Sequence, residues 1–177
     1  LKRLEDAKRD GDPIFGVIRG AGVSNDGRGK GLLVPSSKGQ VRAMEMAYRR
    51  AGLSPDTVQL VECHATGTVI GDGTELRSMA SVFSSKESRP LIASLKANMG
   101  HGITAAGIAG VIKTLESFRH NVIPAHRPVE QNNTALEETG FRLIQENMDW
   151  TSGVPKRVGV SAFGFGGNNA HLIIDAW

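Results

Sequence analysis

The chain has 177 residues with a formal net charge of +3, 22 glycines and a single cysteine. This length suits one domain, or one large piece of a domain, with a substantial apolar core. The charges form no basic tract, which argues against nucleic acid, and no apolar run approaches the ~20 residues of a membrane span. One cysteine excludes an internal disulfide and fits a reducing compartment, so we expect a cytoplasmic location.

The first 31 residues read as a helix, a strand and a glycine-rich loop. A charged helical stretch over residues 1–9 has no capping residue before it and the chain opens on Leu1, so we expect a piece of a longer protein. Pro13 ends this helix, and residues 14–19 form a strand. Residues 20–31 form a loop with Asn25-Asp26-Gly27 as its turn signal. Its glycine spacing matches neither a dinucleotide-binding pattern nor a phosphate loop.

Two amphipathic helices flank the next predicted strand. Ser37 and Gln40 have the spacing of a capping box, and the helix that they start ends at Gly52. A strand over residues 58–62 leads into a polar loop, and a second helix follows with Asp72 or Thr74 as its predicted cap. The core-facing residues share helical spacing: Val41, Met44, Tyr48 and Ala51 in the first helix, and Leu76, Met79, Ala80 and Phe83 in the second.

The rest of the chain continues the alternation of strand and helix. A strand over residues 91–95 leads into a stretch of small residues, behind which Ile108, Val111, Ile112 and Leu115 predict a helix buried against a neighbour. Residues 121–133 read as irregular and residues 141–144 as a short strand. Two further strands cover residues 158–163 and 170–175. This alternation predicts an α/β fold.

Two of these strands end in a histidine within a small-residue loop. His64 follows the strand over residues 58–62, and His101 follows the strand over residues 91–95. With right-handed crossovers, successive strand ends fall on one edge of a sheet. Both imidazoles, Lys96 and the loop around Phe165 are therefore expected around one pocket. A lone histidine is more often structural, but two at matching strand ends favour a site.

Four motifs in register resemble the β-ketoacyl synthases. They are Val61-Glu62-Cys63-His64-Ala65-Thr66-Gly67-Thr68 with Gly71-Asp72-Gly73-Thr74-Glu75, then Ser94-Leu95-Lys96-Ala97-Asn98-Met99-Gly100-His101, then Ala105-Ala106-Gly107, and finally residues 159–171, from Gly159 to His171. Their order and spacing cover nearly the whole chain. The wording of the first two is most similar to modular or iterative synthases that make polyketides and polyunsaturated fatty acids.

This resemblance implies a thiolase-like fold of two similar halves, each layered α-β-α around a mixed sheet. Residues 1–35 would end the N-terminal half and residues 36–177 would form the C-terminal half. The family's enzymes load an acyl group onto a cysteine of the first half, decarboxylate malonyl-carrier protein and condense the two. The implied partners are an acyl carrier protein with its phosphopantetheine arm, the N-terminal half and a second copy of the enzyme in a homodimer. No directly bound cofactor and no metal are implied.

The resemblance also assigns roles to single residues. His64 and His101 would be the paired histidines that donate hydrogen bonds to the enolate oxygen, with Lys96 near the second histidine and Glu75 as its carboxylate partner. Thr66 and Thr68 would bind the phosphopantetheine arm. Phe165, with Phe163 and Gly166 in the same loop, would gate the pocket and complete an oxyanion hole. Asn98 and Asn169 are expected to fix loops, and His171 to be structural.

Some positions depart from the family's pattern. Ala65 stands where a glycine is usual, Gly73-Thr74 replaces a common Pro-Ile, and Asn168 replaces a common threonine. Cys63 lies next to His64 on a strand, so it should face away from the pocket and be an inert buried thiol. Two other interpretations stay open: a non-catalytic subunit of the chain-length-factor kind, or a decarboxylase-only domain. A metal site built from Cys63, His64, Asp72 and His101 fits no standard ligand spacing.

Overall fold

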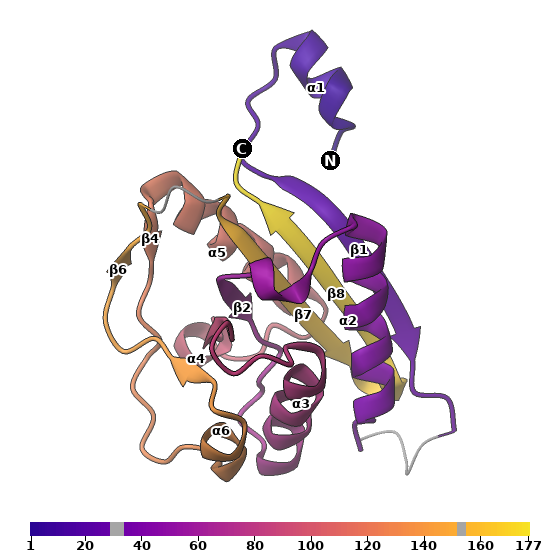
Figure 1. Ribbon diagram of the computed structural model, residues 1–177, viewed down its shortest axis with the longest axis vertical. Coiled ribbons are helices and arrows are strands. Elements are labelled where there is room, and N and C mark those ends of the chain that lie inside the picture. The colour runs from indigo at the N-terminus through magenta and orange to yellow at the C-terminus, as the bar shows by residue number, and fades with distance from the viewer. Residues whose placement is uncertain (29–33, 152–154) are drawn as a thin grey trace.

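The computed structural model describes residues 1–28, 34–151 and 155–177. Its main feature is a mixed sheet with the strand order β1-β8-β7-β2-β3-β5 (Figure 1). Strands β2, β3, β5 and β7 run parallel, whereas β8 is antiparallel to both of its neighbours. The bounds are Val17–Asn25 (β1), Leu60–Glu62 (β2), Leu91–Ala93 (β3), Arg142–Leu143 (β5), Arg157–Gly164 (β7) and Asn168–Asp175 (β8). Strands β4 (Val122–Ile123) and β6 (Met148–Asp149) pair separately.

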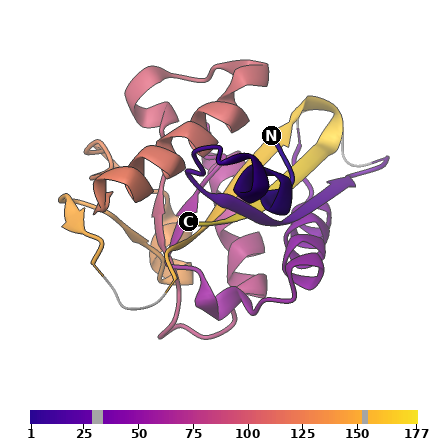
Figure 2. The ribbon, with the colours of Figure 1, turned by 90° about the horizontal axis from the view of Figure 1, so that it is seen from above.

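Helices cover both faces of this sheet, as the view from above makes plain (Figure 2). Helices α2 (Ser37–Ala51), α3 (Val69–Val82) and α6 (Thr134–Thr139) lie on one face, and α5 (Ala106–His120) lies on the other. The shorter elements are α1 (Leu4–Asp10), α4 (Lys96–Met99) and the single 3-10 turns Pro55–Thr57, Ile103–Ala105 and Phe165–Gly167. The predicted layered α/β fold is confirmed. Within the described ranges, no helix combines the length and apolar character needed to cross a membrane.

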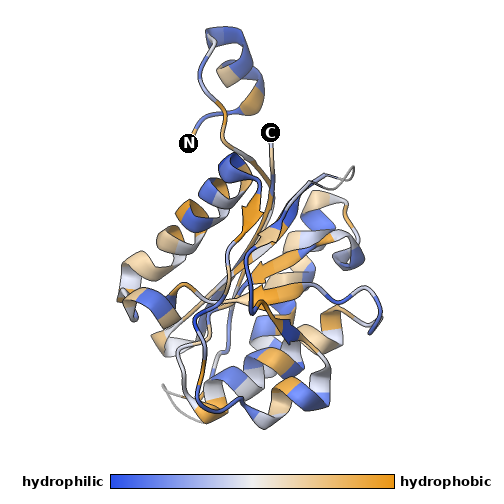
Figure 3. Ribbon diagram, turned by 90° about the vertical axis from the view of Figure 1, so that its left-hand side faces the viewer, coloured by the Kyte–Doolittle hydropathy of each residue, from blue (hydrophilic) through white to orange (hydrophobic). Residues whose placement is uncertain are grey.

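The alternation of side chains along β2 separates two hydrophobic cores. Val61 and Cys63 pack into a cluster with α2, α3 and α6. Leu60 packs into a second cluster with Phe118 of α5 and Val158 of β7. The strands therefore form the apolar centre of the molecule (Figure 3). By the same alternation, Glu62 and His64 belong to the side of α5.

The first predicted loop is largely a strand. Strand β1 runs through residues 20–25, which we expected in the loop, and pairs with β8. Gly20 and Gly22 are needed here because α2 crosses them closely. A Cβ atom on Gly22 would lie 1.9 Å from the carbonyl oxygen of Ala43, and one on Gly20 would lie 2.4 Å from that of Ala47. The last part of the expected loop, residues 29–31, lies outside the described residues.

Two predicted helix starts are wrong. Helix α2 is preceded by Ser36, which makes no side-chain cap, and the Oγ of Ser37 instead accepts a hydrogen bond from Ser78. Helix α3 begins three residues before Asp72, because the Oγ1 of Thr68 accepts the N–H of Gly71 as an N-cap. The predicted end of α2 is confirmed, since Gly52 adopts a left-handed φ of 64°.

Helix α5 is buried along a stripe that matches only part of the prediction. Val111 and Leu115 pack against the second cluster, as expected, but the closest approach to the sheet is made by a small residue. Gly110 packs on Glu62 and Val160, so that a Cβ atom would lie 3.0 Å from Cγ of Glu62. Ile108 and Ile112, which we expected against a neighbour, are 58% and 55% exposed. The small residues therefore face the sheet, and the isoleucines form an apolar face that is open in this chain.

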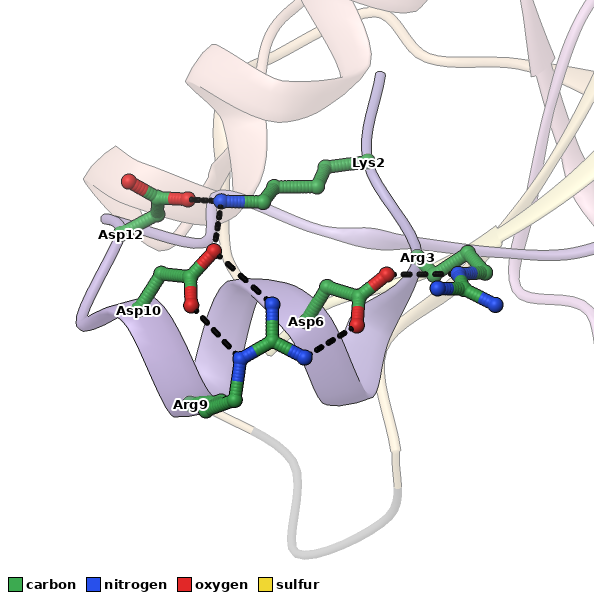
Figure 4. A network of polar contacts seen from close by, with 6 residues as sticks. All are labelled: Lys2, Arg3, Asp6, Arg9, Asp10 and Asp12. Carbon is green, nitrogen blue, oxygen red and sulfur yellow. Dashed lines mark hydrogen bonds and ion pairs between the residues drawn. The ribbon is translucent and has the colours of Figure 1, made fainter.

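Helix α1 stands apart from the sheet and carries a network of surface ion pairs (Figures 1 and 4). Lys2 contacts Asp10 and Asp12, and Arg9 contacts Asp6 and Asp10. Exposed pairs of this kind are screened by water and stabilise a fold very little. The helix is thus held locally, and its position owes little to these charges.

Candidate active site

Three parallel strands deliver the predicted site residues to one edge of the sheet. Glu62 of β2 pairs in register with Ala93 of β3 and with Val160 of β7, so all three strands end on the same side. His64 follows β2, Lys96 follows β3, and the Phe165 turn follows β7. The expected convergence of these loops is confirmed.

The two histidines are in contact. The rings of His64 and His101 meet edge to face, with centroids 5.4 Å apart and an angle of 81° between planes. The ring of Phe163 lies 5.7 Å from that of His64. Residues 37 positions apart in the sequence thus form one cluster, which is the centre of the site.

Both imidazoles are suited to donate a hydrogen bond in the neutral state. Burial lowers the pKa of His64 to about 4, and the charge of Lys96 and the neighbouring His101 add to this effect, so His64 is neutral at pH 7. His101 accepts the backbone N–H of Ile103 at Nδ1 over 3.2 Å. In a neutral ring this places the remaining proton on Nε2, where His101 becomes a donor.

The predicted ion pair between Lys96 and Glu75 is absent, so this expectation is wrong. The carboxylate of Glu75 accepts the backbone N–H groups of His64 and Ala65, each over 2.8 Å. Lys96 instead donates from Nζ to the carbonyl of Cys63 over 3.3 Å. Two amide donors at the start of the loop satisfy the carboxylate without the lysine. Burial, its largest influence, raises the pKa of Glu75 to about 7.

Cys63 faces away from the histidine pair. Its side chain is 3% exposed, and its Sγ lies 3.8 Å from Sδ of Met79 in the core under α3. Burial raises the pKa of this thiol well above its usual value, and the charges of Glu75 and Glu62 add to the effect. The prediction of a buried thiol outside the pocket is confirmed.

The loop after His64 is a tight turn stabilised from α3. Thr66 and Thr68 lie together, with their hydroxyl oxygens 3.5 Å apart. Gly67 donates its N–H to Asp72 over 3.2 Å, and Thr68 caps α3. The two threonines are therefore held side by side on the same edge as the histidines. The residue before them, Ala65, has a φ of 20°, a region that favours glycine.

The turn between β7 and β8 is fixed at its base and exposed at its tip. Phe165 is 67% exposed, and Gly166 has a left-handed φ of 75°. The buried side chain of Asn169 donates to Asp26 over 2.7 Å and to the carbonyl of Gly167 over 3.0 Å. Asn169 thus fixes this loop, as predicted.

Two further predictions have different outcomes. The side chain of Asn98 makes no hydrogen bond to any residue that the structure describes, so its expected loop-fixing role is not observed. His171 is fully buried and shares a hydrogen bond of 3.0 Å between its Nδ1 and Ser161. Its structural assignment is confirmed.

A cavity of about 350 Å³ lies on the other side of the loop that follows β2. Cys63, Thr68, Asp72, Glu75 and His126 are among its lining residues, whereas His64 and His101 are not. The histidine pair is therefore on an open edge rather than inside this cavity. Within the described ranges, no three histidine, cysteine, aspartate or glutamate side chains are grouped so as to hold a metal ion.

Sequence reasoning missed two residues, Glu62 and Lys113, that join the site loops to the fold. Glu62 is buried at the end of β2, where it accepts the N–H of Leu95 over 2.6 Å and the Nζ of Lys113 over 2.7 Å. A signal was available: Glu62 has the same strand parity as His64, and a charged residue in an apolar strand needs a partner.

Comparison with known proteins shows the family. The family described as "Beta-ketoacyl synthase, C-terminal domain" matches residues 15–130, and the "Ketoacyl-synthetase C-terminal extension" matches residues 130–177. A phenolphthiocerol/phthiocerol polyketide synthase of Mycobacterium tuberculosis is 43% identical over 99% of this chain and 10% of its own length. The 5-methyl-1-naphthoate synthase of Streptomyces sahachiroi is 44% identical over 98% of this chain and 10% of its own length. The chain therefore spans about a tenth of these curated relatives.

Solved structures agree. The ketosynthase from module 6 of the bacillaene synthase of Bacillus subtilis superposes with a TM-score of 0.92 and 36% identity, over 99% of this chain and 33% of that one. A structure titled "PfaC Keto synthase-Chain length factor" gives a TM-score of 0.86 and 43% identity, over 99% of this chain and 19% of that one. The fold is thus thiolase-like, as in ketosynthases. This chain belongs to the β-ketoacyl synthase family, as a C-terminal ketosynthase part of the polyketide synthase type.

Proposed function

We propose that this chain is part of a 3-oxoacyl-[acyl-carrier-protein] synthase that performs a decarboxylative Claisen condensation in polyketide or fatty acid biosynthesis. The observation that carries the proposal is the contact between His64 and His101, two imidazoles at one sheet edge. Such a pair provides two preorganised N–H donors for one developing oxyanion.

In the proposed reaction, the malonyl thioester on the carrier protein loses CO₂. The electron pair of the broken C–C bond moves into an enolate, and the negative charge collects on the thioester oxygen. N–H groups of His64 and His101 donate to that oxygen, and each such donor contributes about 3–4 kcal/mol when its removal is measured. The enolate carbon then attacks the acyl thioester on the enzyme's cysteine, which leaves as a thiolate.

The nucleophilic cysteine is proposed to lie outside this chain. Cys63 is its single cysteine, and that thiol is buried on the far side of β2 with a raised pKa. Without a nucleophile on the side of His64, the isolated chain is expected to be inactive. A buried, unpaired thiol also supports a reducing compartment, and we propose the cytoplasm.

The substrate arm is proposed to run over the Thr66–Thr68 turn. The two hydroxyls there are exposed enough and close enough to hydrogen-bond the amides of a phosphopantetheine arm carried by an acyl carrier protein. Phe165 projects from a turn with a glycine at positive φ, which supports a gating role for its ring and an oxyanion role for its backbone N–H.

The open apolar face of α5 is proposed to be covered in the intact enzyme by the N-terminal half of the ketosynthase. Ile103, Ile108 and Ile112 are exposed beside the site, and burying them would close its open edge. A homodimer of the whole enzyme is proposed as well. The boundary between the two halves at residue 35 stays a prediction. The pairing of β1 with β8 and the family match from residue 15 support a boundary earlier in the chain, before β1.

The proposal is tested with His64→Ala and His101→Ala in the intact enzyme. Each variant should lose malonyl decarboxylation by about two orders of magnitude or more while circular dichroism and thermal unfolding stay unchanged. Decarboxylation at the wild-type rate in either variant would refute the role of that histidine.

The alternative is a non-catalytic partner of the chain-length-factor kind or a decarboxylase-only domain. One similar structure names both a ketosynthase and a chain length factor in its title, and this favours the chain-length-factor form of the alternative over other non-catalytic roles. The histidine pair argues against a degenerate, chain-length-factor-like subunit, but a decarboxylase-only domain would use the same pair. The residue at the nucleophile position of the intact protein decides: a cysteine supports a synthase, and another residue supports the alternative.

A further inference from the structure

The backbone pairing between β2 and β3 stops just before the site. The ladder ends at Glu62 and Ala93, with one more bond from the N–H of Cys63 to the carbonyl of Ala93 over 2.8 Å. Beyond this point the two loops that carry His64 and His101 leave the sheet. Their separation must then be set by side-chain contacts.

Three side-chain hydrogen bonds in the described part of the chain then link the two loops. Ser94 Oγ donates to the carbonyl of Ala65 and Lys96 Nζ to the carbonyl of Cys63, each over 3.3 Å, and the carboxylate of Glu62 makes the third and shortest bond. Its Oε1 accepts the N–H of Leu95 over 2.6 Å, and Leu95 immediately precedes Lys96 and the helical turn α4 that leads to His101. Because Glu62 itself lies two residues before His64, its buried side chain connects the start of the His64 loop to the start of the His101 loop.

A lysine of α5 balances the charge of this carboxylate. Lys113 donates to the Oε2 of Glu62 over 2.7 Å, and the two side chains are only 15% and 3% exposed. Gly110, one turn earlier on α5, allows the helix to approach Glu62, since a Cβ atom there would lie 3.0 Å from its Cγ. A carboxylate this well buried and fully partnered has a fixed position.

We propose that Glu62, held by Lys113, is a positioning residue that sets the distance between His64 and His101. This inference rests on the proposed function of the histidine pair. It assigns Glu62 to the decarboxylation step, in which the two histidines act. Acyl transfer depends in that proposal on the turn around Phe165, and this turn is held by Asp26 and Asn169 and not by Glu62. A shift of about 1 Å in a catalytic group lowers a rate by up to about a hundredfold.

The test compares two half-reactions in the intact ketosynthase: malonyl decarboxylation and acyl transfer to the nucleophile. Glu62→Ala and Lys113→Met should each lower kcat for decarboxylation about ten- to hundredfold, with KM for malonyl-carrier protein and the acyl-transfer rate within about twofold of wild type. Equal losses in both half-reactions, or no loss in decarboxylation, would overturn the proposal.

A rescue variant keeps the test decisive if a single substitution unfolds the enzyme. In Glu62→Gln with Lys113→Met, the amide oxygen still accepts the N–H of Leu95 and no buried charge lacks its partner. This double variant should recover decarboxylation to within about threefold of wild type. A double variant no better than Lys113→Met alone would contradict the positioning role.

A matched control is available at the opposite end of the same sheet. Asp175 is a buried carboxylate paired with Arg157 over 2.6 Å, and it lies at the end of β8 away from the histidines. Asp175→Asn should lower thermal stability without changing the ratio of the two half-reactions. The histidine variants separate the two proposals: if they abolish decarboxylation and the Glu62 variants do not, only the positioning inference fails.

Discussion

The carboxylate of Glu75 accepts a hydrogen bond from the backbone N–H of His64. Glu75 belongs to α3, which covers the face of the sheet opposite to α5. A second bond to the N–H of Ala65 makes this a two-point clamp on the turn that presents the histidine. The orientation of His64 thus depends on a buried acid that does not contact its ring. This relationship gives the loop a dependence on pH.

Glu75→Gln should destabilise the chain more at pH 5 than at pH 8. Burial raises the folded-state pKa of Glu75 from 4.5 to about 7, so its contribution to stability is full below pH 4.5 and is lost as pH rises through 7. The glutamine variant lacks this term, and the difference between the two pH values should be on the order of 2–3 kcal/mol. Urea unfolding of both proteins at each pH measures it, and an equal or larger effect at pH 8 would contradict the assignment.

Cys63→Ser should leave most condensation activity in the intact enzyme, because the thiol lies in the core under α3. The buried hydroxyl lowers the free energy of unfolding by about 1–3 kcal/mol, since it replaces a thiol packed against Met79. In the wild-type chain, iodoacetamide should label Cys63 only after urea unfolds it. Complete loss of activity in a folded Cys63→Ser variant, or rapid labelling of the folded chain, would make this cysteine a reactive group instead.

Gly22→Ala should destabilise the chain by about 3 kcal/mol, because the added methyl group would meet the backbone of α2, which cannot move aside as a side chain can. Gly164→Ala is the matched control: its φ is −103°, and its nearest neighbour atom would lie 3.7 Å from the new Cβ. The control should change the free energy of unfolding by less than about 1 kcal/mol. Equal effects of the two substitutions in urea unfolding would show that α2 does not require the glycine.

The convergence of His64 and His101 could be predicted from the sequence because it follows from topology alone. Parallel strands joined by crossovers end on one edge, and residues placed just after those ends must meet there. The burial of Cys63 followed in the same way from strand alternation. These predictions needed no distances.

Other features depend on which of several possible hydrogen-bond or packing partners a side chain contacts, and the sequence does not contain that information. Glu75 was expected to pair with Lys96, but two backbone donors at His64 and Ala65 bind its carboxylate instead. Gly20 and Gly22 lie in a glycine-rich stretch that is typical of a loop, yet they are strand residues whose lack of a side chain lets α2 pack closely on β1. Ile108 and Ile112 have the spacing of a core stripe and face outward.

Lys96→Met should raise the pKa of His64. Burial is the main reason that this pKa falls from 6.5 to about 4, and the charge of Lys96 is the second. Because the folded-state pKa is depressed, the neutral ring stabilises the fold fully above pH 6.5, and this contribution is lost as pH falls through 4. An NMR titration of the imidazole resonances should place the midpoint of His64 near pH 4 in the wild type and clearly higher in Lys96→Met.

Lys86→Met, which removes an exposed lysine from the loop after α3, should leave the midpoint unchanged. A midpoint that is the same in all three proteins would show that Lys96 does not act on His64, and the lysine would then serve only as the donor to the carbonyl of Cys63.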